Sequence, residues 1–164
     1  MRVLGTMAAA AALGCMAPAA AQLEPFTDYE VSDAVWVITT VKVDANMDDF
    51  YLEGLRATWV ESNEIAKELG HIEDYAILQS ALPQSGDFNL MLAVRFESMA
   101  ALGPSRERYD AFMEAWGTAN QDNTEQIARS YPEMREITGE YIMHELTMLD
   151  PDAPAAVAEP EAEN

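Results

Sequence analysis

The stretch of residues 34–43 (AVWVITTVKV) constrains the fold more than any other part of the chain. It is dense in Val, Ile and Thr, whose branched side chains suit an extended strand. Alternate positions are apolar on both sides of the strand, whereas a half-exposed strand alternates between apolar and polar residues. We therefore expect a strand that is covered on both of its faces.

The other predicted elements follow from periodicity and from turn residues. An apolar stripe at steps of three and four predicts a helix over residues 47–69, capped by Asn46 and stopped by Gly70. Turn residues at 83–87 separate two apolar runs, which predicts a hairpin of strands 74–81 and 89–97. Ser105 starts a helix that ends near Trp116. A loop over 117–123, a helical piece over 124–136 and a strand over 138–149 complete the pattern.

The order strand, helix, strand, strand, helix, strand predicts one α+β fold. Two right-handed crossovers that share a sheet give a ferredoxin-like βαββαβ sandwich, with a four-stranded antiparallel sheet and both helices on one face. The first strand then lies between the third and the fourth. Because the first strand is apolar on both sides, we expect the free face of the sheet to pack on the sheet of an identical chain, as a homodimer.

The two ends of the chain carry different signals. Residues 1–21 combine Arg2, an apolar run and the small residues Ala19, Ala20 and Ala21, which predicts a signal peptide cleaved after Ala21 and a periplasmic or secreted protein. A minor alternative is a lipoprotein anchored at Cys15. Residues 22–33 predict a leader, 34–149 the folded domain, and 150–164 a disordered acidic tail rich in Ala and Pro. After the signal, no apolar run reaches the roughly 20 residues of a transmembrane helix.

Net charge and composition limit the classes of molecule that the protein is expected to bind. The net charge of −20, from 29 acidic residues against nine Lys and Arg, repels the phosphates of nucleic acids, so we expect no nucleic-acid role. Cys15 is the only cysteine and lies inside the predicted signal. The two histidines lack further ligands at regular spacing, and the acidic residues form no calcium-loop pattern. We therefore predict no metal site, and no motif for a cofactor is present.

The arrangement resembles the dimeric α+β-barrel superfamily, whose domains pair sheet to sheet. The resemblance covers nearly all of residues 34–149. It is carried by the predicted first helix and the strand after it, through Tyr51, Gly54, Leu55, Trp59, residues 69–72 (LGHI) and residues 75–78 (YAIL). The superfamily includes haem-degrading and quinone-forming monooxygenases, lactone isomerases and polyketide cyclases, together with members without a known activity. No motif specific to one of these is present, so the fold alone implies no function.

Strand alternation selects the candidate site residues. Arg95 on the third strand and Glu145 on the fourth would meet over Thr39, either as an ion pair that fixes the sheet or as a pocket. In such a pocket Arg95 would hold an anionic or carbonyl group and Glu145 would act as the base. Its walls would be ligand-binding residues from the second and fourth strands, namely Tyr75, Gln79, Tyr141 and Met143.

Two histidines and two tryptophans have competing interpretations. His144 is either a core residue or a general base that assists Arg95 and Glu145, and His71 follows a helix end, where it would form a cap. Trp59 and Trp116 lie on helices, where core packing is favoured over ligand stacking. We therefore expect a small, partly apolar ligand bound between helices and sheet. The alternatives are a cofactor-independent enzyme (isomerase, cyclase or monooxygenase) and a protein-interaction module, and whether the protein is an enzyme stays open.

Overall fold

The computed structural model describes residues 22–82 and 86–150. The strands are β1 (Tyr29–Val43), β2 (Asp74–Gln79), β3 (Leu90–Phe96) and β4 (Arg135–Met148). The helices are α1 (Asp48–Leu55), the π-helical turn η1 (Arg56–Val60), α2 (Glu61–Glu68), the 3₁₀ turn η2 (Met99–Leu102), α3 (Arg106–Ala128) and the 3₁₀ turn η3 (Tyr131–Glu133). The predicted signal peptide, Cys15, the tip of the hairpin at 83–85 and residues 151–164 lie outside the described residues.

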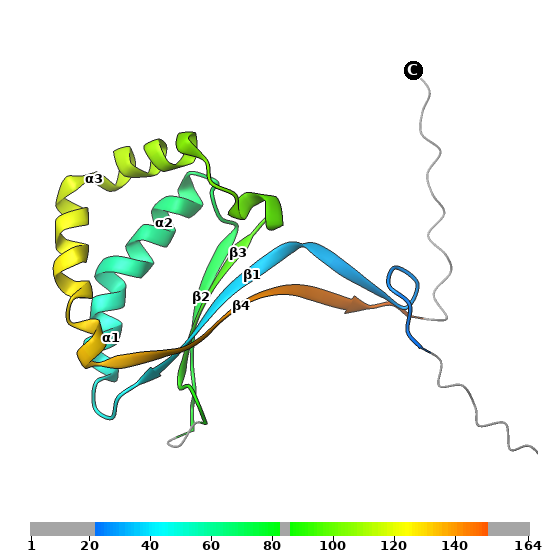
Figure 1. Ribbon diagram of the computed structural model, residues 1–164, viewed down its shortest axis with the longest axis horizontal. Helices are drawn as coiled ribbons and strands as arrows, with labels where there is room; N and C mark the ends of the chain where they lie inside the picture. Colours follow the sequence, from blue (N-terminus) through cyan, green and yellow to red (C-terminus); the bar gives the residue numbers. More distant parts are fainter. Residues whose placement is uncertain (1–21, 83–85, 151–164) are drawn as a thin grey trace, which may run out of the picture.

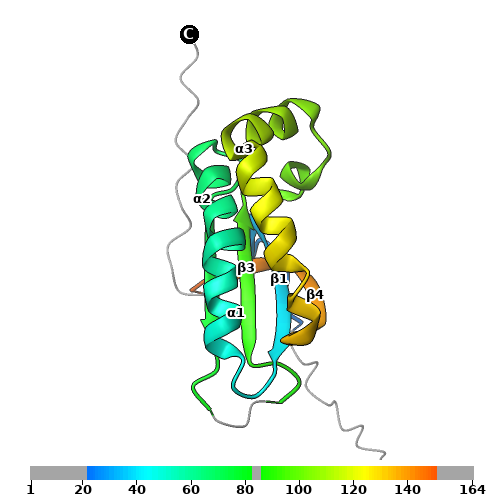
Figure 2. The same ribbon diagram turned by 90° about the vertical axis from the view of Figure 1, so that its left-hand side faces the viewer.

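The four strands form one antiparallel sheet in the order β2-β3-β1-β4. α1, α2 and α3 lie side by side on one face of this sheet (Figures 1 and 2). This is the predicted ferredoxin-like α+β fold, with β1 between β3 and β4. Only β1 and β3 have a strand on both sides, so the most β-branched stretch of the sequence occupies the middle of the sheet.

The hydrophobic core fills the space between the helices and the sheet. β1 contributes Val41 and Val43, and β3 contributes Leu90 and Leu92, all at most 8% exposed. The face of β3 that carries Leu90 and Leu92 therefore meets the helix layer. The helices contribute Tyr51 and Leu55, and η3 contributes Tyr131. Because Tyr131 comes from the segment just before β4, the core joins the two ends of the domain.

The predicted first helix exists, but it contains one irregular turn. Residues 48–68 are helical, and η1 inserts a π-helical turn between α1 and α2. Asn46 does not cap this helix, because it has a positive φ of 68° and Met47 occupies the cap position without a side-chain bond. Gly70 ends it as predicted, with a φ of 69°. The N–H of His71 donates to the carbonyl of Ala66, and the N–H of Gly70 to that of Lys67, which is the bonding pattern of a Schellman cap.

The second helix is longer than predicted. Ser105 caps α3 by accepting a hydrogen bond from the N–H of Arg108, as predicted. The predicted loop over residues 117–123 is wrong, since α3 runs on to Ala128 through a kink at Gly117, which has φ 74° and ψ 159°. Figure 1 shows that this kink bends the helix sharply. Because these angles are not helical, α3 consists of two helical segments that meet at Gly117, and one residue in a glycine-specific conformation turns the chain between them.

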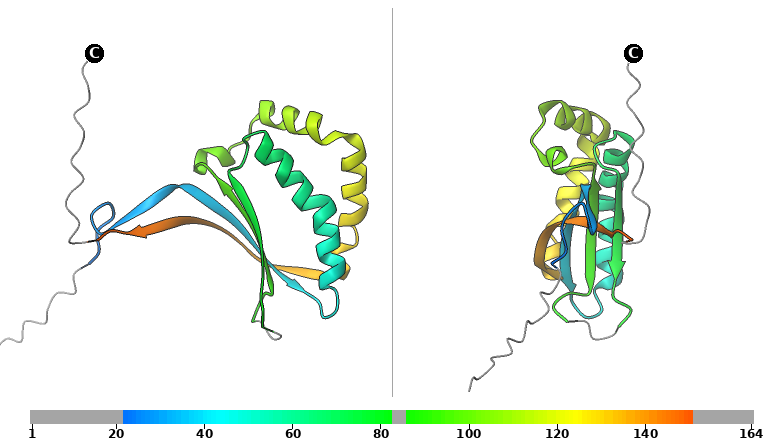
Figure 3. Two further views of the ribbon diagram at one scale, coloured as in Figure 1. Left: turned by 180° about the vertical axis from the view of Figure 1, so that it is seen from behind. Right: turned by 90° about the vertical axis from the view of Figure 1, so that its right-hand side faces the viewer.

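β1 and β4 both extend beyond the rest of the sheet. β3 pairs with residues 35–41 of β1, whereas Tyr29, Glu30 and Val31 pair only with the end of β4, at Met148, Thr147 and Leu146. This two-stranded ribbon (residues 29–34 and 145–148, called the arm below) projects away from the body on the side opposite to the helices (Figures 1 and 3). Part of the predicted leader is therefore strand, and β4 begins at Arg135 rather than at residue 138.

A final structural feature concerns membranes. Among the helices that the structure describes, none combines the length and the apolarity of a segment that crosses a bilayer.

We predict that Gly117→Ala destabilises the protein. Gly117 adopts backbone angles that L-amino acids avoid, so a Cβ there costs about 1–3 kcal/mol of unfolding free energy, although no neighbouring atom lies within 4 Å. Urea denaturation monitored by circular dichroism measures the change. Gly86→Ala is the matched control, because Gly86 also has open space around it but no positive φ. Equal stabilities for the two variants would contradict this account of the kink.

Candidate functional site

A cavity of about 440 Å³ lies between the helix layer and the sheet. We call it the interlayer cavity. Most of its lining side chains are large and apolar or aromatic, and a few are polar. The lining residues are Tyr51, Leu55, Thr58, Trp59, Ser62, Leu92, Phe112, Trp116, Thr124, Tyr131 and Arg135. An apolar cavity with a few polar groups is the usual form of a small-molecule site, and this volume falls in the usual range.

The π-helical turn η1 brings two neighbouring residues to the cavity wall. Thr58 and Trp59 both line the cavity, although they are adjacent in sequence. A π turn holds one more residue than an α turn and leaves a carbonyl poorly paired. Here the carbonyl of Trp59 accepts hydrogen bonds from Asn63 Nδ2 at 2.7 Å and from Ser62 Oγ at 3.0 Å. These two side chains stabilise the irregular turn.

Tyr131 is fixed against the first helix by a buried hydrogen bond. Its hydroxyl lies 2.7 Å from Thr58 Oγ1, and Thr58 Oγ1 donates to the carbonyl of Gly54 at 2.9 Å. A Cβ on Gly54 would lie only 2.9 Å from Tyr131 Cε1, so glycine allows the ring to approach this closely. The ring of Tyr51 meets that of Tyr131 edge to face, at 5.1 Å between centroids. The polar end of the cavity is therefore rigidly built.

Both tyrosines stay neutral over a wider pH range than free tyrosine. Burial raises the pKa of Tyr51, and a hydrogen bond with Arg135 partly opposes this. Burial also raises the pKa of Tyr131, against the opposing effect of the hydrogen bond with Thr58. At neutral pH both hydroxyls therefore carry their protons, which makes them donors and not bases.

Two polar atoms at the cavity have no hydrogen-bond partner within residues 22–82 and 86–150. They are Thr124 Oγ1 and Arg135 Nε, both buried from solvent. The guanidinium carbon of Arg135 lies 5.7 Å from the centroid of the Tyr131 ring, which is within range of a cation–π contact. Leaving a buried donor unpaired costs about 1–3 kcal/mol, so such atoms call for an explanation.

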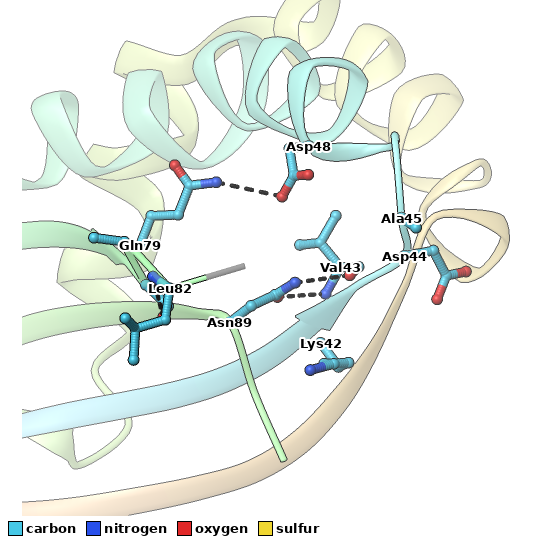
Figure 4. A pocket seen from close by; sticks show the side chains of 10 residues that line it. Lys42, Val43, Asp44, Ala45, Asp48, Gln79, Leu82 and Asn89 are labelled. Carbon is cyan, nitrogen blue, oxygen red and sulfur yellow. Dashed lines mark hydrogen bonds between the residues drawn. The ribbon is translucent and has the colours of Figure 1, made fainter. Parts of the chain in front are cut away.

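A second cleft lies at the end of the sheet where β1 runs into α1, and Figure 4 shows it from close by. Its volume is about 400 Å³. Its polar groups bind one another: Asn89 bonds both the N–H and the carbonyl of Val43, at 2.7 and 2.8 Å, and Gln79 Nε2 donates to Asp48 at 3.3 Å. Asn89 thus extends the pairing of β3 with β1 by side-chain bonds. The polar residues of this cleft are therefore explained by their role in the fold, whereas two polar atoms of the interlayer cavity are not.

The comparisons with known proteins do not assign a function. No protein-family model and no curated protein matches the sequence. Similar solved structures include HapK from Hahella chejuensis, which is 12% identical with a TM-score of 0.40, and the match covers 75% of this chain and 99% of HapK.

Two more similar structures are described as dimeric and ferredoxin-like, with unknown function. That from Bacteroides fragilis is 11% identical with a TM-score of 0.38, and the match covers 73% of this chain and 100% of the other. That from Thermobifida fusca is 8% identical with a TM-score of 0.37, over 72% and 92% of the two chains. At these scores the likeness says nothing about what this chain binds.

The predicted pair of Arg95 and Glu145 does not form. Arg95 instead forms an ion pair with Glu73, which immediately precedes β2. In the register Arg95 lies opposite Trp36, and Trp36 lies opposite Met143. Thr39, over which the pair was expected to meet, lies opposite Leu92 and therefore on the helix-covered face. Trp36, and not a small residue, separates Arg95 from β4.

The four predicted ligand-binding residues fall on two different faces. Tyr75 and Gln79 lie on the helix side, where Tyr75 meets Trp59 edge to face at 5.3 Å and its hydroxyl bonds Glu64. This hydrogen bond raises the pKa of Tyr75 to about 12. Tyr141 and Met143 pair with Ile38 and Trp36 and lie on the face away from the helices. The sheet separates the two pairs, so they do not line one pocket.

The histidines do not form a catalytic group with Arg95. His144 is exposed, and its Nδ1 lies 2.9 Å from the carbonyl of Ser32, next to the arm. His71 belongs to the cap of α2 through its backbone. In the described part of the chain no cluster of three or more His, Cys, Asp or Glu side chains is arranged to hold a metal ion. Trp59 and Trp116, expected to favour core packing, both line the interlayer cavity.

The polar residues of the cavity were not among the predicted site residues. Thr58, Thr124 and Tyr131 lie in helical segments, and Arg135 lies at a strand start that was predicted to be helical. The one available signal was an arginine close to the buried tyrosine in the run YPEMR at residues 131–135. That spacing brings the two side chains to one cavity only because η3 turns the chain back onto the sheet.

We predict that Thr58 and Tyr131 stabilise the fold as a pair. Thr58→Val leaves the Tyr131 hydroxyl without its partner, which costs about 1–3 kcal/mol of unfolding free energy, and Tyr131→Phe removes the same bond from the other side. The double variant should lose less than the sum, with a coupling energy of about 0.5–1.5 kcal/mol in urea denaturation. Thr118→Val, at an exposed helical position, is the control. Additive effects would mean that the bond does not form.

Proposed function

We propose that this protein binds a small, mostly apolar molecule in the interlayer cavity. The proposal is supported by the volume of about 440 Å³ and by walls of Trp59, Phe112, Trp116 and Leu92. The rings of Phe112 and Trp116 stack at 5.9 Å and offer a flat surface. A planar or chain-like apolar body fits such walls, because aromatic rings favour stacked or edge-to-face contacts.

One observation carries the proposal more than any other: the cavity holds two buried polar atoms without partners. Thr124 Oγ1 and Arg135 Nε lie among apolar walls, where solvent does not reach them. In the second cleft, at the end of the sheet where β1 runs into α1, the polar groups are paired with each other. A bound molecule with one polar end would satisfy the unpaired atoms and bury its apolar part against the rings.

A cofactor-independent enzyme remains the weaker candidate. Its predicted residues, Arg95, Glu145 and His144, do not converge, and Arg95 is already paired with Glu73. In the interlayer cavity the titratable groups are two tyrosines of raised pKa and one arginine, which supply donors but no base at neutral pH. Binding requires only the cavity and its donors.

We also propose that two copies pair through the sheet face that the helices leave uncovered, here called the free face. Trp36 and Ile38 of β1, Leu78 of β2, and Tyr141 and Met143 of β4 lie on it. Leu78, Tyr141 and Met143 are 47–56% exposed. Arg95 lies beside Trp36 on the same face and is paired with Glu73, whereas these five residues are all apolar or aromatic. A face of this kind is self-complementary, as a twofold dimer requires.

The arm supports the same pairing. A two-stranded ribbon is at best marginally stable alone in water, and residues 145–148 are all exposed. Leu146 and Met148, at the end of β4, are 58% and 63% exposed. The arm projects on the side of the free face (Figure 3), so a second copy docked there would lie against it. Pairing would then cover both surfaces at once.

The export of the protein is a further proposal. The Arg2-led apolar segment and the alanines at 19–21 support cleavage after Ala21 and a periplasmic or secreted protein, and Cys15 offers the lipoprotein alternative. The intact mass of the protein from the exported fraction distinguishes a chain that begins at Gln22, a lipidated chain that begins at Cys15, and the uncleaved chain.

We predict that native mass spectrometry of the exported protein finds a reproducible small-molecule adduct, which gives the mass of the ligand directly. Ser62→Phe should abolish the adduct, because Ser62 lines the cavity and a phenyl ring there fills it. Glu68→Phe is the matched control, since Glu68 is an exposed residue of the same helix and does not line the cavity. An adduct that persists in Ser62→Phe would place the ligand elsewhere and contradict the proposal.

We predict that Met143→Glu converts the dimer to a monomer. A carboxylate opposite Trp36 would have to be buried in the proposed interface without a partner, which costs several kcal/mol. Light scattering coupled to size-exclusion chromatography measures the mass. Phe50→Glu is the control, because Phe50 is 61% exposed on α1 and far from the free face in the sheet topology. A wild-type protein that is monomeric at micromolar concentration would overturn the pairing.

A further inference from the structure

We infer that the ligand of the interlayer cavity is a carboxylate with an apolar body, and that Arg135 binds its carboxylate. This inference deepens the proposed function and rests on it. It starts from the state of Arg135, which contributes to the wall of a mostly apolar cavity and whose Nε is buried without a hydrogen-bond partner.

Among the residues that the structure describes, no carboxylate forms an ion pair with Arg135. Ion pairs in the described residues involve Lys67, Arg95 and Arg106, whose partners are Asp74, Glu73 and Asp110. None of these carboxylates pairs with Arg135, although acidic residues outnumber basic ones 29 to nine. The acidic residues nearest to Arg135 in the sequence, Glu133 and Glu136, are both exposed. Because the charge of Arg135 is not neutralised by an ion pair, it can bind an external anion in the cavity.

The surroundings of Arg135 favour a carboxylate over a neutral polar group. A guanidinium carries a fixed planar array of N–H donors that matches the two oxygens of a carboxylate. The cation lies above the Tyr131 ring, 5.7 Å from its centroid, which limits how far the side chain can turn. Tyr51 is hydrogen-bonded to Arg135, and its burial-raised pKa keeps its hydroxyl protonated as a neighbouring donor. A carboxylate here is surrounded by donors.

The rest of the cavity defines the other end of the ligand. Phe112 and Trp116 stack on each other, and Trp59 and Leu92 complete the apolar wall. Apart from Arg135, no charged side chain lines the cavity among the described residues. One charged donor at an otherwise uncharged cavity fits a ligand with a single anionic group and an apolar body. An aromatic carboxylate meets both conditions.

The test compares three probes of nearly equal shape by isothermal titration calorimetry: 2-naphthoate, 2-naphthamide and 2-naphthylmethylammonium. The full-length mature protein should bind 2-naphthoate about tenfold to hundredfold more tightly than 2-naphthamide, because a charge-assisted hydrogen bond contributes about 1.5–3 kcal/mol. The cationic probe should bind weakest. The net negative charge of the protein would by itself favour the opposite order, so a preference for the anion requires a local cation.

Arg135→Gln should reduce the affinity for 2-naphthoate far more than that for 2-naphthamide, so that the preference for the anion is lost. Arg129→Gln is the control, because it removes the same charge from an exposed position next to α3 and should keep the preference. Arg135→Lys keeps the positive charge but lacks the planar array of donors. It should therefore retain part of the preference for 2-naphthoate that Arg135→Gln loses. The comparison of probes on the wild-type protein stands even if an Arg135 variant fails to fold.

The outcomes separate the two proposals. If 2-naphthoate and 2-naphthamide bind equally well to the wild type, or if Arg129→Gln loses the preference and Arg135→Gln keeps it, Arg135 does not bind the anion and the inference falls. The cavity would then still bind apolar molecules. If none of the three probes binds and Ser62→Phe keeps the native adduct, the proposed cavity site itself falls.

Discussion

The hydrogen bond between Tyr131 and Thr58 connects parts of the chain that no other buried side-chain bond of the described residues connects. Thr58 belongs to the irregular turn of the first helical segment, and Tyr131 to the short turn before the last strand. The bond forms in the core, where a hydroxyl without a partner is costly. It requires Gly54, because any side chain there would displace the Tyr131 ring. Once the ring is fixed, the start of β4 and Arg135 are placed at the cavity.

The fold could be predicted from the sequence because its signals are local or follow from topology. The branched residues of 34–43 mark a central strand, and the turn residues mark a hairpin. Two crossovers then leave one sensible strand order. The exact strand ends could not be predicted, since the arm pairs β1 with β4 where no helix covers them. Gly117 signalled a break, and the helix is interrupted there, but the sequence does not show that a second helical segment follows at once in place of a loop.

The candidate site was harder to predict, for a physical reason. Each strand could be sorted correctly into two faces, but matching the faces of neighbouring strands depends on the register. A shift of one residue moves every side chain to the other face. Thr39 and Arg95 were assigned to one face, although Thr39 lies under the helices and Arg95 on the opposite side. Thr58, Thr124 and Tyr131 come from helical segments and Arg135 from the start of β4, and at Thr58 the π turn disturbs the period that a sequence reveals.

The exposed edge of β4 has a consequence for how this chain behaves at high concentration. Residues 140–148 are exposed, and the edge includes Ile142, Leu146 and Met148. A strand edge that carries exposed apolar side chains and free backbone groups is a template for uncontrolled association of strands. The net charge of −20 opposes this, because like-charged molecules repel at distances longer than the reach of hydrogen bonds. That repulsion extends only about 10 Å at 0.1 M salt and about 3 Å at 1 M. The colloidal stability of this protein therefore depends on ionic strength, and its acidity protects an edge that its fold leaves open.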